Sequence, residues 1–177
     1  MRVGHGYDSH RFDDAREMVL GGVNVPDHAG LSGHSDGDAV AHAVIDAILG
    51  AAGAGNVGSH FPPDDERWRG ADSMDLLRRA MTLLEGHNVQ VVNVDVTVIC
   101  ETPRIGPVAG AMRDRLGEVL GIGPGFVSVK GKTNEGMGWI GAGEGIAVHA
   151  VALVDRMREP YGGTGGTGGA GGGALPL

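Results

Sequence analysis

The chain has little sulfur, few aromatic residues and no long apolar stretch, and each shortage excludes a class of protein. Its 177 residues include one cysteine, Cys100, so neither an internal disulfide nor a zinc site made of several thiolates can form. Aromatic residues are 4% of the chain, too few for a stacking surface that binds single-stranded nucleic acid. No apolar run reaches the roughly 18 residues of a membrane-spanning helix, and residues 1–10 lack the apolar segment of a secretory signal. We therefore expect a cytoplasmic protein that does not act at a membrane.

Positive charge is also scarce. Lys and Arg total 14 against 22 Asp and Glu, which gives a net charge of −8. A surface of this sign argues against a broad nucleic-acid footprint, because such a footprint needs clustered cations. An anionic ligand would have to be received by metal ions or by a few local groups.

Glycine and histidine, in contrast, are abundant, with 34 and 8 copies. From Gly162 onward the chain consists almost entirely of Gly, Thr and Ala, which have no side chains to offset the entropy of ordering them. We predict a single catalytic domain over residues 1–160, followed by a flexible glycine-rich tail over residues 161–177. The eight histidines are more informative about function than the net charge.

Hydrophobic periodicity predicts alternating strands and helices. Strands are expected at 2–8, 19–25, 92–98, 127–132 and 146–155, and a loop at Ser9–Phe12. Three helices are expected: one with Ser35 as its N-cap that ends at about Ala52, one that starts at Asp72 or Ser73 and includes Leu84, and one from 108 to Gly121. This order predicts an α+β fold with a single mixed or antiparallel sheet and helices on one face. The other face must then be buried by self-association, and the valine-rich strand 92–98 is the strongest candidate for that face. Long Gly-rich connections at 53–70 and 133–145 are typical of functional loops.

A metal site is indicated by Asp8, His10 and His42. Asp8 and His10 are two residues apart and leave the same side of an extended segment, and His42 lies on a polar helical face that could meet them. Two imidazoles and one carboxylate satisfy three positions of a tetrahedral Zn²⁺ and leave the fourth open. The same set fits a non-haem Fe(II) facial triad, and it also fits a solvated strand end beside a surface histidine.

Three other segments suit phosphate or nucleotide binding. His34 and Ser35 stand at a helix start, where free N–H groups favour a phosphate, although a simple N-cap explains them equally. Residues 130–135, KGKTNE, resemble a phosphate-handling turn or a polar loop. Residues 101–107 could close over a base or sugar, or mark a proline-defined helix entry. Cys100 is expected to be a small buried residue rather than a nucleophile.

Five segments taken together closely resemble the 2-C-methyl-D-erythritol 2,4-cyclodiphosphate synthase family. They are GHGYDSHRF at 4–12, LSGHSDGDAVAHAVIDAILGAAG at 31–53, HFPPDDERWRGADS at 60–73, NVDVTVICETPRI at 93–105 and KGKTNEGMGWIGAGEGIAVHAV at 130–151. The resemblance covers nearly all of residues 1–157. It implies an enzyme of non-mevalonate isoprenoid biosynthesis, a homotrimer whose sheet faces pack together and whose active sites lie between subunits, and a need for zinc plus magnesium or manganese.

The implied reaction is a cyclisation. The 2-phosphate of 4-diphosphocytidyl-2-C-methyl-D-erythritol 2-phosphate attacks the β-phosphorus of its own diphosphate, and CMP leaves. The resemblance implies zinc on Asp8, His10 and His42, the second cation on Glu135, and His34 and Thr133 as the groups that steady the transition state. It assigns substrate binding to Asp8, His10, His34, Ser35, Asn56, Gly58, Phe61, Asp64, Asp65, Cys100, Arg104, Ile105, Gly106, Lys132, Thr133, Asn134, Glu135, Trp139 and Ala142.

The chain departs from the family pattern at four places. The family's D-I-G is here Asn56-Val57-Gly58, its F-P-D is Phe61-Pro62-Pro63, and Gly136 replaces a usual Lys. Ala142 stands where Arg is frequent in a cavity on the trimer axis that can take an isoprenoid diphosphate. With Glu144 nearby and no Arg at 142, we expect carboxylates without their cations there, and weak binding of such a diphosphate.

Two other functions remain open from the residues alone. An Fe(II) oxygenase would use the facial triad, but it requires many short strands in a double-stranded β-helix, and the sequence shows no such pattern. A non-catalytic trimeric metal or nucleotide binder would need neither His34 nor Glu135.

Overall fold

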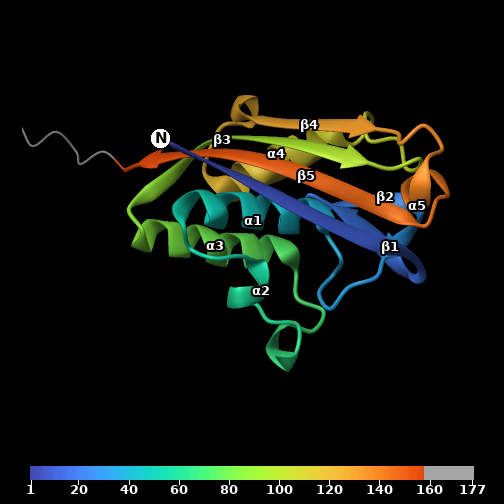
Figure 1. Ribbon diagram of the computed structural model, residues 1–177, viewed down its shortest axis with the longest axis horizontal. Helices are drawn as coiled ribbons and strands as arrows, with labels where there is room; N and C mark the ends of the chain where they lie inside the picture. Colours follow the sequence, from blue (N-terminus) through green and yellow to red (C-terminus); the bar gives the residue numbers. More distant parts are fainter. Residues whose placement is uncertain (158–177) are drawn as a thin grey trace, which may run out of the picture.

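The computed structural model describes residues 1–157, which form one curled five-stranded sheet and the helices that pack on it (Figure 1). The strands are β1 (Arg2–Leu20), β2 (Val23–Leu31), β3 (Val89–Ile99), β4 (Val127–Lys132) and β5 (Gly145–Arg156). The α-helices are α1 (Ala39–Ala52), α2 (Val57–His60), α3 (Ser73–Gly86), α4 (Ala109–Leu120) and α5 (Gly138–Gly141), with 3₁₀ turns at Glu66–Trp68 and Pro124–Phe126. The tail expected at 161–177 lies outside the described residues.

The sheet is mixed, in the order β2-β1-β5-β3-β4. β1 pairs antiparallel with β2 and β5, β3 pairs antiparallel with β5, and β3 and β4 run parallel, joined through α4. The α+β class, the single mixed sheet and the order of elements are therefore confirmed.

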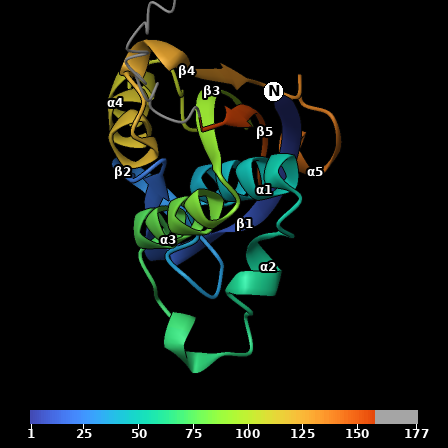
Figure 2. The same ribbon diagram turned by 90° about the vertical axis from the view of Figure 1, so that its left-hand side faces the viewer.

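Helices α1, α3 and α4 lie on the same side of the sheet (Figure 2). On that side the valines of β3, Val94, Val96 and Val98, are at most 1% exposed. On the opposite face of the sheet, the side chains of β1 and β5 are not covered by helices. Val3 and Val151 on this face are 68% and 43% exposed. The prediction that the valines of 92–98 form the uncovered face is wrong, because these valines pack against the helices; β1 and β5 carry the open apolar residues instead.

Strand β1 and helix α1 approach each other at backbone distance because β1 carries glycine on its covered side. A Cβ added to Gly4 would lie 1.9 Å from the carbonyl oxygen of Ala47, and one added to Gly6 would lie 1.9 Å from that of Ala43. No side chain fits in either place. The GHG segment and the small residues of α1 therefore seat the helix directly on the strand, which brings His42 beside the residues that follow Gly6.

Three boundaries differ from the sequence expectation. Ser9–Phe12 is strand and not loop, because β1 continues along β5 as far as Arg11. The segment 19–25 is a hairpin: Gly21 and Gly22, with φ of 59° and 72°, make the left-handed turn between β1 and β2. The connections 53–70 and 133–145 contain short helices rather than only loop.

Helix α1 begins at Ala39, with Asp38 rather than Ser35 as its N-cap. The fully buried Asp38 carboxylate accepts hydrogen bonds from the backbone N–H groups of Gly21, Gly22 and Ala41 at 2.8, 2.7 and 3.0 Å. Burial raises the pKa of Asp38 to about 6 against the opposing effect of these donors. Asp38 therefore fixes the β1–β2 turn to the start of α1. In the described residues, we find no helix with the length and apolar character needed to cross a bilayer.

Candidate active site

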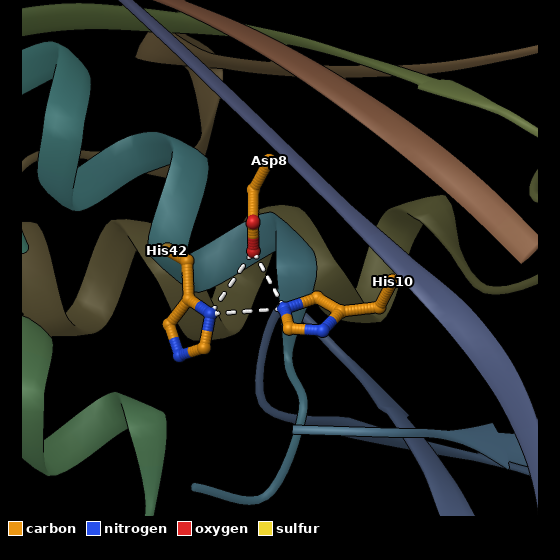
Figure 3. Close-up of side chains that lie close together, drawn as sticks. All are labelled: Asp8, His10 and His42. Atoms are coloured by element: carbon orange, nitrogen blue, oxygen red, sulfur yellow. Dashed lines mark hydrogen bonds and ion pairs between the residues drawn. The ribbon is translucent and has the colours of Figure 1, made fainter. Parts of the chain in front are cut away.

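Asp8, His10 and His42 meet at the junction of β1 and α1 (Figure 3). Asp8 Oδ2 lies 2.9 Å from His10 Nε2 and 3.0 Å from His42 Nδ1, and these two nitrogens are 3.4 Å apart. One carboxylate oxygen and two imidazole nitrogens thus form a compact triangle. They are the only group of three or more possible metal-ligand residues this close together in residues 1–157.

The charges in this triangle support one another. Burial opposes the ionised form of Asp8, but hydrogen bonds and attraction from His10 and His42 lower its pKa well below the ordinary value. Burial likewise opposes a charged His42, and Asp8, with smaller contributions from Asp38 and Asp36, raises the pKa of the ring above 6.5. Asp8 is therefore an anion throughout the physiological range, ready to hold a cation.

A hollow of about 240 Å³ opens beside the triad. Among the expected site residues it is lined by Asp8, His10, His34, Ser35, His42, Gly58 and Phe61; Val57, Pro63, Trp68 and Leu76 complete the wall. Phe61 and Trp68 pack edge to face, with ring centroids 5.1 Å apart, and give the hollow an apolar side. One polar end and one apolar wall suit a phosphorylated ligand with a small carbon skeleton.

Other residues expected at this end lie just outside the hollow. Asn56 caps α2: its Oδ1 accepts from the backbone N–H of Ser59 at 2.9 Å. Asp65 is held by the Arg67 guanidinium, and its carbonyl oxygen lies 3.3 Å from His34 Nε2. Asp64 is exposed and does not line the hollow. The loop that carries these residues is tied to α1 by Asp46, whose carboxylate accepts from the backbone N–H of Val57 at 2.7 Å.

A second hollow, of about 320 Å³, lies at the ends of β3 and β4. Its walls are Cys100, Glu101, Pro103, Arg104, Ile105, Gly106, Gly131, Lys132 and Thr133. Burial raises the pKa of the Cys100 thiol to about 11, and the thiol donates to the carbonyl oxygen of Pro103 at 3.3 Å. Cys100 is thus buried and neutral. The positively charged side chains that line this hollow are those of Lys132 and Arg104.

Glu101 ties the turn after β4 to the end of β3. One oxygen of its carboxylate accepts from the backbone N–H groups of Asn134 at 2.9 Å and of Gly136 at 3.2 Å. Between them Glu135 takes a left-handed φ of 52°, and Thr133 Oγ1 donates to its carboxylate at 2.9 Å. Glu101 lies in the segment 101–107 that the sequence indicates as a possible lid over a base or sugar, but its role in holding the next turn is not visible from the sequence.

The two hollows share no lining residue, and β5 lies between β1 and β3. Within one chain the structure therefore does not bring Glu135 or Thr133 to the triad. Most of the expected site residues therefore fall into two groups. One group surrounds the triad, and the other lies in the segments 100–106 and 131–135.

Trp139 and Ala142 belong to neither group. Trp139 lines a third hollow of about 380 Å³ with Ser9, His10, Arg11 and Glu144, and Ala142 ends α5. The Arg11 guanidinium lies 3.5 Å from the Glu144 carboxylate. The extension of β1 thus places a cation, Arg11, beside Glu144, which the sequence expectation did not include. Weak binding of an isoprenoid diphosphate on a trimer axis stays a prediction.

Comparison with known proteins identifies the family. Residues 1–155 match the model of the YgbB family. The chain belongs to the YgbB family. It is 54% identical over 154 residues to the 2-C-methyl-D-erythritol 2,4-cyclodiphosphate synthase of Symbiobacterium thermophilum. The aligned residues cover 87% of this chain and 98% of that protein.

Solved structures agree with this membership. A structure of 2C-methyl-D-erythritol-2,4-cyclodiphosphate synthase in a CDP-bound form superimposes with a TM-score of 0.79 at 36% identity, covering 87% of this chain and all of that one. The CDP complex of IspF from Plasmodium falciparum gives a TM-score of 0.77 at 34% identity, with 89% and 97% of the two chains covered. The fold and the sequence thus point to the same YgbB relatives.

Proposed function

We propose that the protein cyclises 4-diphosphocytidyl-2-C-methyl-D-erythritol 2-phosphate to 2-C-methyl-D-erythritol 2,4-cyclodiphosphate and releases CMP. The relatives that it matches along nearly their whole length carry this enzyme name. The observation that carries the proposal is the Asp8, His10 and His42 triangle beside a hollow with one polar end and one apolar wall. The proposal includes a place in isoprenoid biosynthesis, residues 1–160 as the catalytic domain and the cytoplasm as the compartment.

The triad suits zinc. Two ligands of one Zn²⁺ each lie about 2.0–2.2 Å from the ion, so ligand atoms 2.9–3.4 Å apart are compatible with a single ion between them. The donor set of two imidazoles and a carboxylate leaves a position for a phosphate oxygen. When bound, zinc here and Mg²⁺ or Mn²⁺ at Glu135 would neutralise phosphate oxygens and polarise the reacting phosphate.

The protein's own side chains orient the substrate. His34 and Ser35 face the triad hollow, where they would contact phosphate oxygens, and Gly58 and Phe61 would bound the methylerythritol. Lys132 and Thr133 would hold the diphosphate, and residues 100–106 would receive the cytidine. The CDP complexes of the structural relatives support a cytidine ligand. The reaction is intramolecular, so most of its acceleration comes from holding the 2-phosphate in line with the β-phosphorus.

A homotrimer would unite the two halves of the site. Within one chain the triad hollow is separate from the second hollow, at the ends of β3 and β4, and Val3, Tyr7 and Val151 are exposed on the open sheet face. Packing three such faces around an axis would bury these residues and place one chain's triad beside a neighbour's 100–106 and 131–135 segments. Analytical ultracentrifugation at micromolar concentration should give a trimer, and a stable monomer would contradict this arrangement.

A phosphorus NMR time course tests the activity. With Zn²⁺ and Mg²⁺ the substrate signals should convert to those of a cyclic diphosphate and CMP, and chelation of the metals should stop the conversion. Unchanged substrate together with tight binding of CDP would favour the non-catalytic nucleotide binder. An oxygenase predicts dioxygen consumption with a 2-oxoacid, which we expect to be absent.

A further inference from the structure

The His42 ring has two different sides. Its Nδ1 faces the triad, 3.0 Å from Asp8 Oδ2. Its Nε2 faces away from the triad, toward two serine hydroxyls: Ser35 Oγ at 3.1 Å and Ser73 Oγ at 3.0 Å. A neutral imidazole has one donor and one acceptor nitrogen, so what these hydroxyls offer to Nε2 decides which nitrogen has the free lone pair.

The proton of Ser73 is already committed. Ser73 Oγ lies 2.5 Å from Asp36 Oδ1, and an ionised carboxylate only accepts, so the hydroxyl donates to Asp36. Asp36 is itself held in place, because its carboxylate accepts from the backbone N–H groups of Ser73 at 2.9 Å and of Asp38 at 3.1 Å. Ser73 is fully buried. Its oxygen therefore presents a lone pair to His42 Nε2 and not a proton.

The hydroxyl proton of Ser35 is not directed to a carboxylate in this way. Its hydroxyl oxygen lies 3.4 Å from the backbone nitrogen of Gly37 and 3.5 Å from Ser73 Oγ, both at the long end of hydrogen bonding. The hydroxyl of Ser35 can accordingly turn to match either form of the ring. Ser73 is the residue that distinguishes the two forms.

We propose that Asp36 and Ser73 act as a positioning pair that keeps the His42 proton on Nε2 and so turns the lone pair of Nδ1 toward the metal triad. The pair works against Asp8, whose carboxylate favours a proton on Nδ1 while no cation occupies the triad. It also fixes the plane of the ring between α1 and the start of α3. The part of this inference that concerns metal affinity rests on the proposed function; the part that concerns the proton does not.

The proton can be located without activity. In ¹⁵N-histidine-labelled, metal-free protein at alkaline pH, where the ring is neutral, His42 should carry its proton on Nε2 in a substantial fraction of molecules. In Ser73→Ala this fraction should fall, and in Ser73→Thr, which keeps the hydroxyl, it should recover. Ser35→Ala is the matched control and should leave the fraction nearly unchanged. A proton on Nδ1 alone in the unmodified protein, or the same fraction in Ser73→Ala, would overturn the proposal.

Zinc affinity, measured by competition with a chelator, gives the second readout. Loss of the hydrogen-bond partner behind a metal-binding histidine typically weakens affinity about 10–100-fold, and we expect a loss of this size in Ser73→Ala but not in Ser35→Ala. Equal losses in both variants would contradict the assignment of the role to Ser73. If the unmodified protein binds no zinc but His42 keeps its proton on Nε2, the metal part of the proposed function fails while the positioning pair stands.

Discussion

The hollow beside the triad and the hollow at the ends of β3 and β4 differ in how firmly their side chains are held. In the triad hollow, both nitrogens of His42 have partners within 3.1 Å, and its helix rests on glycines of β1 at backbone distance. At the hollow by the ends of β3 and β4, Lys132 and Thr133 are exposed, as is the neighbouring Glu135. The turn that carries them is held by two backbone hydrogen bonds to Glu101 and by local bonds between Asn134 and Met137.

This difference indicates two ways to prepare a site. The triad is rigid before any ligand arrives, because its geometry is set by packing of regular elements. The 132–136 turn has few buried contacts and can adjust when substrate and cation bind. Substitutions in the first region should therefore damage the fold or the zinc site, and substitutions in the second should affect substrate and second-cation binding while leaving the fold and the zinc site intact.

The largest effect is expected from Gly6→Ala. The added Cβ would overlap the carbonyl oxygen of Ala43, so α1 must move away from β1. Overpacking of this kind should cost about 3 kcal/mol or more in the free energy of unfolding, measured by urea denaturation. Gly50→Ala, where nothing lies within 4 Å of the added atom, should be neutral or stabilising by up to about 1 kcal/mol. Gly6→Ala with unchanged stability would mean that β1 and α1 are not in backbone contact.

His42→Ala tests the triad itself. Removal of one of three protein ligands should reduce the zinc content of the purified protein. Losing only a hydrogen bond to a metal ligand typically reduces activity about 10–100-fold, and the loss of activity in His42→Ala should be larger than that. The control His28→Ala changes an exposed histidine on β2 and should affect neither quantity. Zinc would be measured by atomic emission on purified protein, and full occupancy in His42→Ala would refute the ligand assignment.

Glu101→Ala should separate the two hollows. Without its carboxylate the backbone N–H groups of Asn134 and Gly136 lose their acceptor, so the turn becomes less ordered. We expect KM for the cytidyl substrate to rise about 10-fold, as for the loss of about 1.4 kcal/mol of binding energy. Zinc content should not change. Glu118→Ala, which removes an exposed carboxylate paired with Arg115 on α4, controls for charge; an equal rise in KM there would exclude a specific role for Glu101.

The smallest effect concerns pH and the metal-free protein. The pKa of His42 is raised above 6.5, so its contribution to stability is complete below that value and is lost as pH rises through the folded-state pKa. The pKa of Asp8 is lowered, so Asp8 stays ionised in this range and adds no slope. Metal-free protein should therefore lose stability above pH 6.5, by less than about 1.4 kcal/mol per pH unit. Zinc should stabilise the protein increasingly over the same range, because its ligands must be deprotonated. A flat stability profile in urea for the metal-free protein would contradict this coupling.

Local patterns predicted much of the fold. The alternation of β3, the start of α3 at Ser73 and the end of α4 before Gly121 follow from side-chain periodicity and capping, which depend on neighbours along the chain. The failures occurred where distant contacts decide. Ser9–Phe12 belongs to a strand because this segment pairs with β5. Asp38 rather than Ser35 caps α1, because the β1–β2 turn supplies two additional backbone N–H donors to the Asp38 carboxylate.

The chemical types of the site and their spacing follow from the order of residues along the chain: a carboxylate and an imidazole two residues apart, a second imidazole on a helix, and a polar turn after a strand. Which of these groups come together depends on how the strands and helices pack. Periodicity says which residues share a face but not which face the helices cover, so Val94, Val96 and Val98 were assigned to the wrong side. Ser73 reaches His42 from 31 positions away because α1 and α3 pack together, and no spacing rule along the chain encodes that contact.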